Sequence, residues 1–210
     1  MIYFIDFIFR WLHVLFGIAW VGLLFYFNFV QGEYLKEATA EAKEDVLTKL
    51  APRALWWFRW ASVATLLTGL YLFYSLGPSA NQYIGVAALM GTIMFLNVWL
   101  VIWPKQKVVC GIVTGDKPAA AGKALLASRT NTVMSMPMLF GMLGSKHGPQ
   151  GGGFEQISLS DPGFIIVVVT ILAIAGNGLF GKLRQLESIN GVLLCSLALT
   201  ALLYLALHFF

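Results

Sequence analysis

The sequence predicts an all-α protein, a polytopic transmembrane helix bundle with about six membrane spans. Hydrophobic residues make up 59% of the 210-residue chain and charged residues only 11%, whereas a soluble domain carries roughly 25% charged residues. Six runs are apolar over the length of about 20 residues that a helix needs to cross a bilayer. Lysine and arginine gather in alternate loops between these runs, a pattern typical of multi-pass membrane proteins.

The predicted spans form one membrane domain over residues 1–210, with no separate water-soluble domain. Their approximate bounds are 5–30, 54–76, 83–103, 124–145, 163–181 and 188–209. The first run is too long for a cleavable signal peptide, so we expect a retained anchor helix. Residues 32–53, between the first two spans, are polar and weakly amphipathic, which predicts a short surface helix.

The fourth span differs from the other five in composition. Asp116, Lys117 and Pro118 predict a helix start that lies outside the membrane. Residues 130–138 are the least apolar membrane segment, so this helix should be buried among the others. Pro137 should kink it. The glycine-rich residues 148–161 that follow predict a flexible loop.

The distribution of cations orients the chain in the membrane. Of the 14 lysines and arginines, most lie in or beside the loops after spans one, three and five: Lys36, Lys43, Lys49, Arg53, Lys105, Lys107, Lys117, Lys123, Arg129, Lys182 and Arg184. By the positive-inside rule these loops face the cytoplasm. We therefore expect a bacterial inner-membrane protein, embedded in lipid, with both termini extracytoplasmic. The net charge of +4 then reflects topology, and we expect no nucleic-acid partner.

His13 in the first span is the main candidate for a cofactor ligand. An ionisable group at membrane depth is energetically expensive and by default marks a pathway or a site. Arg10, His13 and Gly17 lie on one helix face: Gly17 clears space for a flat ring, and Arg10 could meet a propionate. This pattern predicts haem b, with His13 as axial ligand of the metal. The alternative is a structural histidine bonded to a neighbouring helix.

The second axial ligand stays open. His147, at the end of the fourth span, is either that ligand or a solvated loop residue. Four methionines could supply an axial sulfur, although methionines are more often core residues: Met134, Met136, Met138 and Met142. Cys110 and Cys195 are not part of a CxxCH motif, which excludes covalent attachment of c-type haem.

A second group of polar residues falls in the cytoplasmic half of the predicted bundle: Arg59, Asn97, Arg129, Asn131 and Asn177. Such groups normally face the interior and pair with one another. Arg59 lies among tryptophans and is either an interfacial anchor or a functional residue. The asparagines either bond between helices or bind a substrate. With a haem near the opposite face, this layout would let electrons pass across the membrane.

Several of these stretches resemble the membrane domain of the bacterial membrane-bound urate oxidases (urate hydroxylases). The resemblance is carried by residues 10–14, 17–22, 57–60, 67–69, 97–109, 127–131, 136–140 and 146–147. The first stretch is also similar to the membrane protoporphyrinogen oxidases and copper-resistance membrane proteins, in which a first-helix histidine is associated with haem. In the urate oxidases a cytochrome c domain follows the membrane domain. Since this chain ends at Phe210 without that domain, we expect its electrons to leave to a separate c-type cytochrome.

The resemblance implies oxidation of urate to 5-hydroxyisourate. In that reaction the urate anion would meet Arg59 and Arg129, and Asn97 and Asn131 would orient it through hydrogen bonds. Two other functions stay open. One is a non-enzymatic accessory subunit of a larger respiratory complex. The other is a protoporphyrinogen oxidase-like enzyme that releases electrons to quinone.

Overall fold

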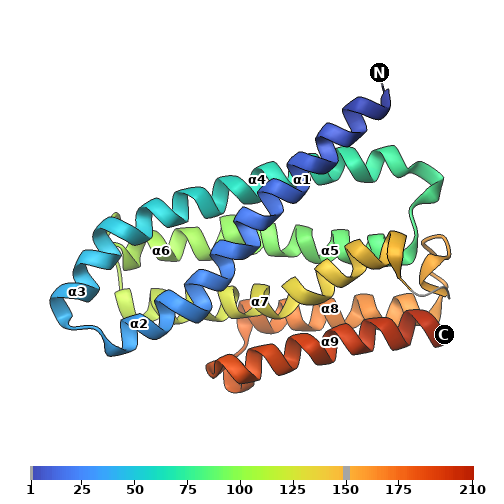
Figure 1. Cartoon of the computed structure of the whole chain (residues 1–210). Helices are drawn as coiled ribbons and strands as arrows, with labels where there is room; N and C mark the ends of the chain where they lie inside the picture. Colours follow the sequence, from blue (N-terminus) through green and yellow to red (C-terminus); the bar gives the residue numbers. More distant parts are fainter. Residues whose placement is uncertain (1, 149–151) are drawn as a thin grey trace.

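Helices that run side by side along one long axis make up the molecule (Figure 1). The computed structural model describes residues 2–148 and 152–210, so part of the predicted flexible loop at 148–161 lies outside the described residues. The α-helices are α1 (Ile2–Phe25), α2 (Gly32–Glu37), α3 (Ala40–Asp45), α4 (Ala51–Leu76), α5 (Gln82–Asn97), α6 (Trp103–Val109), α7 (Lys117–His147), α8 (Pro162–Phe180) and α9 (Ile189–Phe209). The predicted all-α helix bundle is confirmed.

Short segments of other helix types join or extend these helices. Three are π-helical: η1 (Tyr26–Gln31), η2 (Val46–Leu50) and η4 (Val98–Ile102). Three are 3₁₀-helical: η3 (Gly77–Ser79), η5 (Gly152–Phe154) and η6 (Arg184–Glu187). Because η1 joins α1 to α2, and η2 joins α3 to α4, two long helices extend through the region predicted to form a separate surface helix.

The prediction of a separate surface helix over residues 32–53 was wrong. The chain turns sharply at residues 38–39, where both backbones are extended. Thr39 caps the next helix by accepting a hydrogen bond from the backbone N–H of Ala42. The polar residues are therefore the ends of two membrane helices that project beyond the apolar zone, because their helical hydrogen bonds continue without a break.

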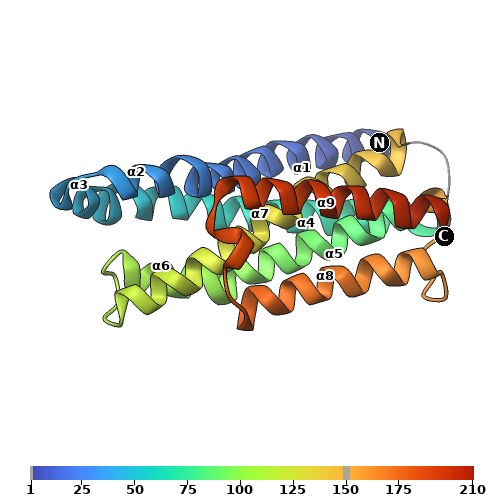
Figure 2. The ribbon, with the colours of Figure 1, turned by 90° about the horizontal axis from the view of Figure 1, so that it is seen from below.

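Both termini lie at the same end of the bundle (Figures 1 and 2). The α2–α3 turn and the loop between α6 and α7 lie at the opposite end, and the connection between α8 and α9 lies about midway along the molecule, on the side of α8 and α9 that is away from the termini. An even number of passes produces this arrangement. The loops predicted to be rich in lysine and arginine therefore all lie on the side of the bundle opposite the termini.

Five stretches among the described residues are long and apolar enough to cross a membrane: Tyr3–Glu37, Ala40–Ser79, Gln82–Val109, Pro162–Phe180 and Ile189–Phe209. They correspond to five of the six predicted spans, within one residue where a span extends past a helix end. The fourth predicted span, residues 124–145, lies in α7, which is too polar to meet the same criterion by composition alone.

The helix α7 is central to the packing of the bundle, as its composition predicts. It packs against α1, α5, α6, α8 and α9, and every residue from 129 to 135 is buried. The predicted start is also confirmed, because Asp116 accepts a hydrogen bond from the backbone N–H of Ala119 at 3.0 Å. Pro137 lies inside the helix without ending it. A polar helix is tolerated in a bilayer when its neighbours shield it from lipid.

The apolar core draws side chains from α1, α4, α5, α7, α8 and α9. Where α5 and α7 pack together, its buried side chains include Met90 and Met94 from α5, and Met134 and Met138 from α7. Flexible methionine side chains fill irregular gaps between helices. The contacts of Met134 and Met138 thus support their interpretation as core residues.

Candidate functional site

His13 lies on α1 where this helix packs against α4. Its Nδ1 is 3.0 Å from the backbone carbonyl oxygen of Thr65 and 3.1 Å from Oγ1 of Thr68. A carbonyl oxygen can only accept, so Nδ1 carries a proton and donates it. Gly69 makes room for the ring, since a Cβ at this position would lie 2.9 Å from Cε1 of His13. His13 therefore joins two helices, as expected of a structural histidine.

The same contacts prepare the other ring nitrogen to act as a ligand. With the proton on Nδ1, the lone pair of Nε2 is free, and metal-binding histidines commonly donate their second N–H to a backbone carbonyl. No described residue forms a hydrogen bond with Nε2 of His13.

The surroundings of the His13 ring leave space on α1. No described heavy atom of a neighbouring element lies within 4 Å of a Cβ built at Gly17, and Arg10 is exposed. The predicted cleared space and charged rim are therefore both available. His13 thus presents a ring nitrogen without a described hydrogen bond, with open space at Gly17 and an exposed cation at Arg10 on the same helix.

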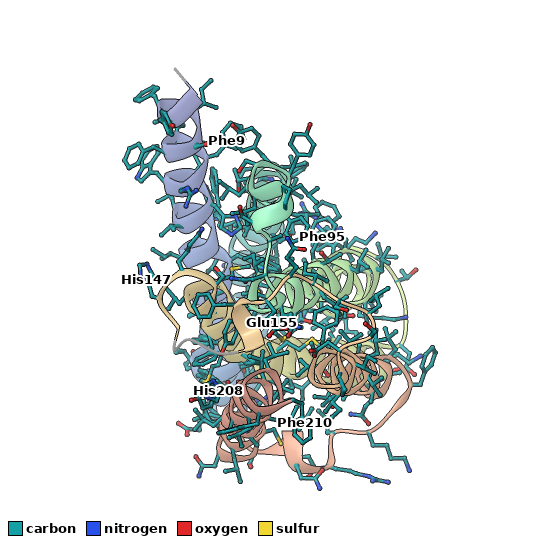
Figure 3. All side chains as sticks on the ribbon, turned by 90° about the vertical axis from the view of Figure 1, so that its right-hand side faces the viewer. Phe9, Phe95, His147, Glu155, His208 and Phe210 are labelled. Carbon is teal, nitrogen blue, oxygen red and sulfur yellow. The ribbon has the colours of Figure 1, made fainter. Side chains whose placement is uncertain are left out.

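His147 lies at the end of α7 and is exposed. Figure 3 views the bundle from the end that carries His147, His208 and Phe210. The ring of His208 stacks on Tyr204 with 5.2 Å between centroids. Within the described parts of the chain, no three His, Cys, Asp or Glu side chains gather closely enough to hold a metal ion. The described side chains thus offer single imidazoles for axial ligation.

Arg129 on α7 is only 3% exposed. Its Nη2 lies 3.9 Å from Oε1 of Glu33, a carboxylate that Lys36 also binds at 2.8 Å. No described group accepts a hydrogen bond from Nε or Nη1 of Arg129. Burying a guanidinium with unpaired N–H groups is unfavourable. Arg129 is therefore suited to bind an anion.

Two amide side chains that the sequence pattern did not single out lie in the same region. Asn28 is 2% exposed, and its Nδ2 donates to the carbonyl of Leu24 at 2.9 Å and to Oγ of Ser128 at 2.8 Å. The oxygens Oδ1 of Asn28 and Oε1 of Gln31 accept from no described donor. Both residues lie in η1, and π-helical segments occur frequently at functional sites.

Asn97 and Asn131 are brought together by the fold. Nδ2 of Asn97 donates to Oδ1 of Asn131 at 2.8 Å, and Nδ2 of Asn131 donates to the carbonyl of Met94 at 2.9 Å. These bonds join the end of α5 to the middle of α7. They support an interhelical role for both asparagines, the alternative that the sequence left open.

Arg59 on α4 has different surroundings from Arg129. Its guanidinium carbon lies 3.7 Å from the ring centre of Trp103 and 6.0 Å from that of Trp99. A cation over an aromatic face is attracted by the ring quadrupole. The described partners of Arg59 are thus aromatic rings, whereas the described partner of Arg129 is a carboxylate. Asn177, the fifth residue of the predicted polar group, is exposed on α8.

Comparison with families of known proteins matches residues 78–207 to the family described as urate oxidase N-terminal. The matched region is more than half of the chain and runs from the turn before α5 nearly to the end of α9. It contains Arg129 and the Asn97–Asn131 pair. It begins after α1, which carries His13, and after α4, which carries the hydrogen-bond partners of His13. Neither the curated proteins nor the solved structures contain a match. The chain belongs to the urate oxidase N-terminal family.

Proposed function

We propose that this chain is a membrane redox protein that binds haem b, oxidises urate to 5-hydroxyisourate and passes the electrons to a c-type cytochrome. Membership of the urate oxidase N-terminal family supports the substrate. The redox proposal depends on which ring nitrogen of His13 is left without a hydrogen bond. Nδ1 of His13 donates to Thr65 and Thr68, which leaves Nε2 available to iron.

Haem b supplies a one-electron redox couple when bound. His13 would hold the iron through Nε2, while the Thr65 carbonyl and the Thr68 hydroxyl fix the orientation of the imidazole. Arg10 lies about one turn away on the same helix, where its guanidinium would pair with a propionate. His147 would be the candidate for a second iron ligand.

Oxidation of urate to 5-hydroxyisourate forms a bond between C5 and an oxygen from water. Two electrons and two protons are released, and the cytochrome takes the electrons one at a time. Of the four residues predicted to contact urate, Arg129 retains two buried N–H-bearing nitrogens without a described acceptor and Arg59 retains one. Arg59 also lies over the ring of Trp103. Asn97 and Asn131 already bond to each other. We therefore assign the charged contact to Arg129, with Arg59 as the comparison.

Urate turnover in membranes that contain the protein tests this assignment. Loss of a hydrogen bond between charged partners weakens binding by about 1.5–3 kcal/mol, so Arg129→Gln should reduce kcat/KM by roughly 10- to 150-fold. Arg59→Gln is the matched control and should have a much smaller effect. Unchanged turnover in an Arg59→Ala, Arg129→Ala double variant would remove both residues from the site.

Glu33 provides a test of opposite sign. Its carboxylate is the described negative charge beside Arg129, at 3.9 Å, so it competes with a bound anion. Glu33→Gln should lower the KM for urate. A higher KM would mean that the Glu33 carboxylate holds Arg129 in its binding position.

We also propose that the protein lies in the bacterial inner membrane with both termini extracytoplasmic. The positive-inside rule supports this orientation, since the loops with most lysines and arginines lie on the side of the bundle opposite the termini.

Absence of haem from well-folded protein would favour an accessory subunit of a respiratory complex. Oxidation of protoporphyrinogen, measured with a quinone acceptor, would favour a protoporphyrinogen oxidase-like enzyme.

A further inference from the structure

Five of the seven tryptophans lie on two neighbouring stretches of helix. Trp56, Trp57 and Trp60 lie on α4, and Trp99 and Trp103 lie in η4 and at the start of α6. The rings of Trp60 and Trp99 are in contact, with 5.6 Å between centroids, so the two stretches meet at one depth of the bundle. The start of α4 and α6 both lie toward the end that carries the α2–α3 turn (Figure 1). Because tryptophan is enriched where a membrane meets water, these five residues indicate a membrane surface at this end.

A hollow on the surface of α4 lies at the same level. It is lined by Pro52, Arg53, Trp56 and Trp57, has a volume of about 420 Å³ and is open to the surroundings. Arg53, Trp56 and Trp57 follow the i, i+3, i+4 spacing and therefore share one helix face. Trp56 and Trp57 are 47% and 64% exposed, and their rings are nearly perpendicular, with 5.1 Å between centroids. A bound molecule can thus reach both indole rings and the guanidinium.

Arg53 supplies the charge of the hollow. No carboxylate among the described residues forms an ion pair with its guanidinium. Lys49, one turn earlier in the chain, is paired with Asp45 instead. The other lining side chains are proline and tryptophan. Since a guanidinium binds phosphate through two parallel hydrogen bonds, the hollow suits a phosphate group on an otherwise apolar molecule.

The exposed face of α4 continues from the hollow toward the other end of the helix. Arg53, Trp60 and Leu67 recur at heptad spacing and so lie along one stripe, and all three are exposed. With the tryptophans at the level of the lipid headgroups, Arg53 lies about 5 Å farther from the bilayer centre and Leu67 about 15 Å closer to it. The order of charge, aromatic ring and aliphatic side chain matches the phosphate, glycerol and acyl chains of a phospholipid.

We infer that this hollow binds an anionic phospholipid in the membrane leaflet at the α2–α3 end of the bundle. Arg53 pairs with the phosphate, and the rings of Trp56 and Trp57 pack against the glycerol backbone and the upper acyl chains. The lining of the hollow has no carboxylate to receive the ammonium group of a zwitterionic lipid. A lipid with net negative charge, such as phosphatidylglycerol, is therefore preferred over phosphatidylcholine. This site depends on neither haem nor urate.

Quenching of tryptophan fluorescence in bilayers tests the inference. The full-length protein is reconstituted in phosphatidylcholine vesicles with increasing fractions of phosphatidylglycerol that has brominated acyl chains, and brominated phosphatidylcholine serves as the reference. Bromine quenches tryptophan only at short range, so the two curves give the relative affinity of the two lipids beside the tryptophans. Wild-type protein should prefer phosphatidylglycerol by roughly fivefold or more, since one cation near a membrane surface contributes about 1 kcal/mol.

Arg53→Gln removes the charge and should lower this preference roughly fivefold. Arg53→Lys keeps a positive charge and should retain most of the preference, although an ammonium group cannot bind phosphate through a planar fork. Arg184→Gln is the matched control, at an exposed arginine in η6, on the connection between α8 and α9. It should leave the preference unchanged. Circular dichroism checks that each variant is folded.

Equal quenching by the two brominated lipids in wild-type protein would overturn the inference, as would an unchanged preference in Arg53→Gln. An equal loss of preference in Arg53→Gln and Arg184→Gln would also overturn it, because the lipid would then respond to the overall surface charge. Inorganic phosphate, added at constant ionic strength, distinguishes a lipid from a free anion. The preference should persist in phosphate, and its loss would mean that the hollow binds free phosphate instead of a lipid.

Discussion

Gly69→Ala probes how tightly α4 holds the His13 ring. The added Cβ would lie 2.9 Å from Cε1 of His13, closer than two carbon atoms pack, and 3.4 Å from Nδ1. The ring must move away from Thr65 and Thr68, which hold it at 3.0 and 3.1 Å. Overpacking of a well-packed site costs about 1–3 kcal/mol, and a lost hydrogen bond adds about 1 kcal/mol. We expect a total destabilisation of roughly 2–4 kcal/mol.

Gly17→Ala is the matched control on the partner helix. No described heavy atom of a neighbouring element lies within 4 Å of a Cβ at this position. Alanine is favoured over glycine in a helix interior by up to about 1 kcal/mol, so Gly17→Ala should leave stability unchanged or slightly higher. Unfolding in detergent with increasing SDS, followed by circular dichroism, compares the two substitutions.

A double-mutant cycle isolates the contact between Gly69 and His13. In a His13→Ala background the ring is absent, so Gly69→Ala should cost little. The coupling energy should then account for most of the effect of Gly69→Ala alone, within the range of 0.5–3 kcal/mol known for residues in contact. Two results would show that α4 does not hold the His13 ring tightly at Gly69. One is a change in the free energy of unfolding that is no larger for Gly69→Ala than for Gly17→Ala, and the other is an equal change for Gly69→Ala with and without His13.

Three further predictions concern the rest of the bundle. Asn131→Leu should destabilise the protein by about 1–3 kcal/mol, because it leaves Nδ2 of Asn97 without its acceptor. The double variant Asn97→Leu, Asn131→Leu should be destabilised by less than the sum of the two single variants. Unfolding in SDS measures all three free energies. Burial raises the pKa of the Cys110 thiol, and the charge of Lys117 partly opposes this shift. Alkylation of Cys110 by iodoacetamide should therefore be slow at neutral pH and accelerate only well above the ordinary pKa of a thiol. Fast labelling of Cys110 near neutral pH would contradict this prediction. A cysteine introduced as Glu41→Cys should react with a membrane-impermeant maleimide only in opened cells. A cysteine introduced as Glu155→Cys should react in intact cells. The reverse pattern would mean that the chain has the opposite orientation in the membrane.

Much of the fold follows from composition. The apolar runs identify five spans because each presents enough hydrophobic surface to lipid. The fourth span could be placed because Asp116 and Pro118 mark its start and because its polar residues require shielding by other helices. The continuation of two helices through residues 32–53 could not be read from the sequence, since a polar helix end and a surface helix have the same composition.

The candidate site was only partly predictable. His13 stood out because an imidazole is expensive at membrane depth, but its bond to Thr65 depends on the register between α1 and α4. The Asn97–Asn131 bond depends in the same way on how α5 and α7 align. Asn28 and Gln31 were missed because they lie in a run of aromatic residues, and only tertiary packing buries them and bonds Asn28 to Ser128 on α7.

The reduced-minus-oxidised absorbance spectrum of the purified protein, recorded beside that of His13→Ala, shows whether His13 holds a haem. Wild-type protein should have a b-type α-band that is lost in His13→Ala and kept in His208→Ala. Haem binding through His13 is ruled out if folded wild-type protein reconstituted with haem shows no such band, or if the band is unchanged in His13→Ala. In that case the role of His13 would be the hydrogen-bonded contact between α1 and α4.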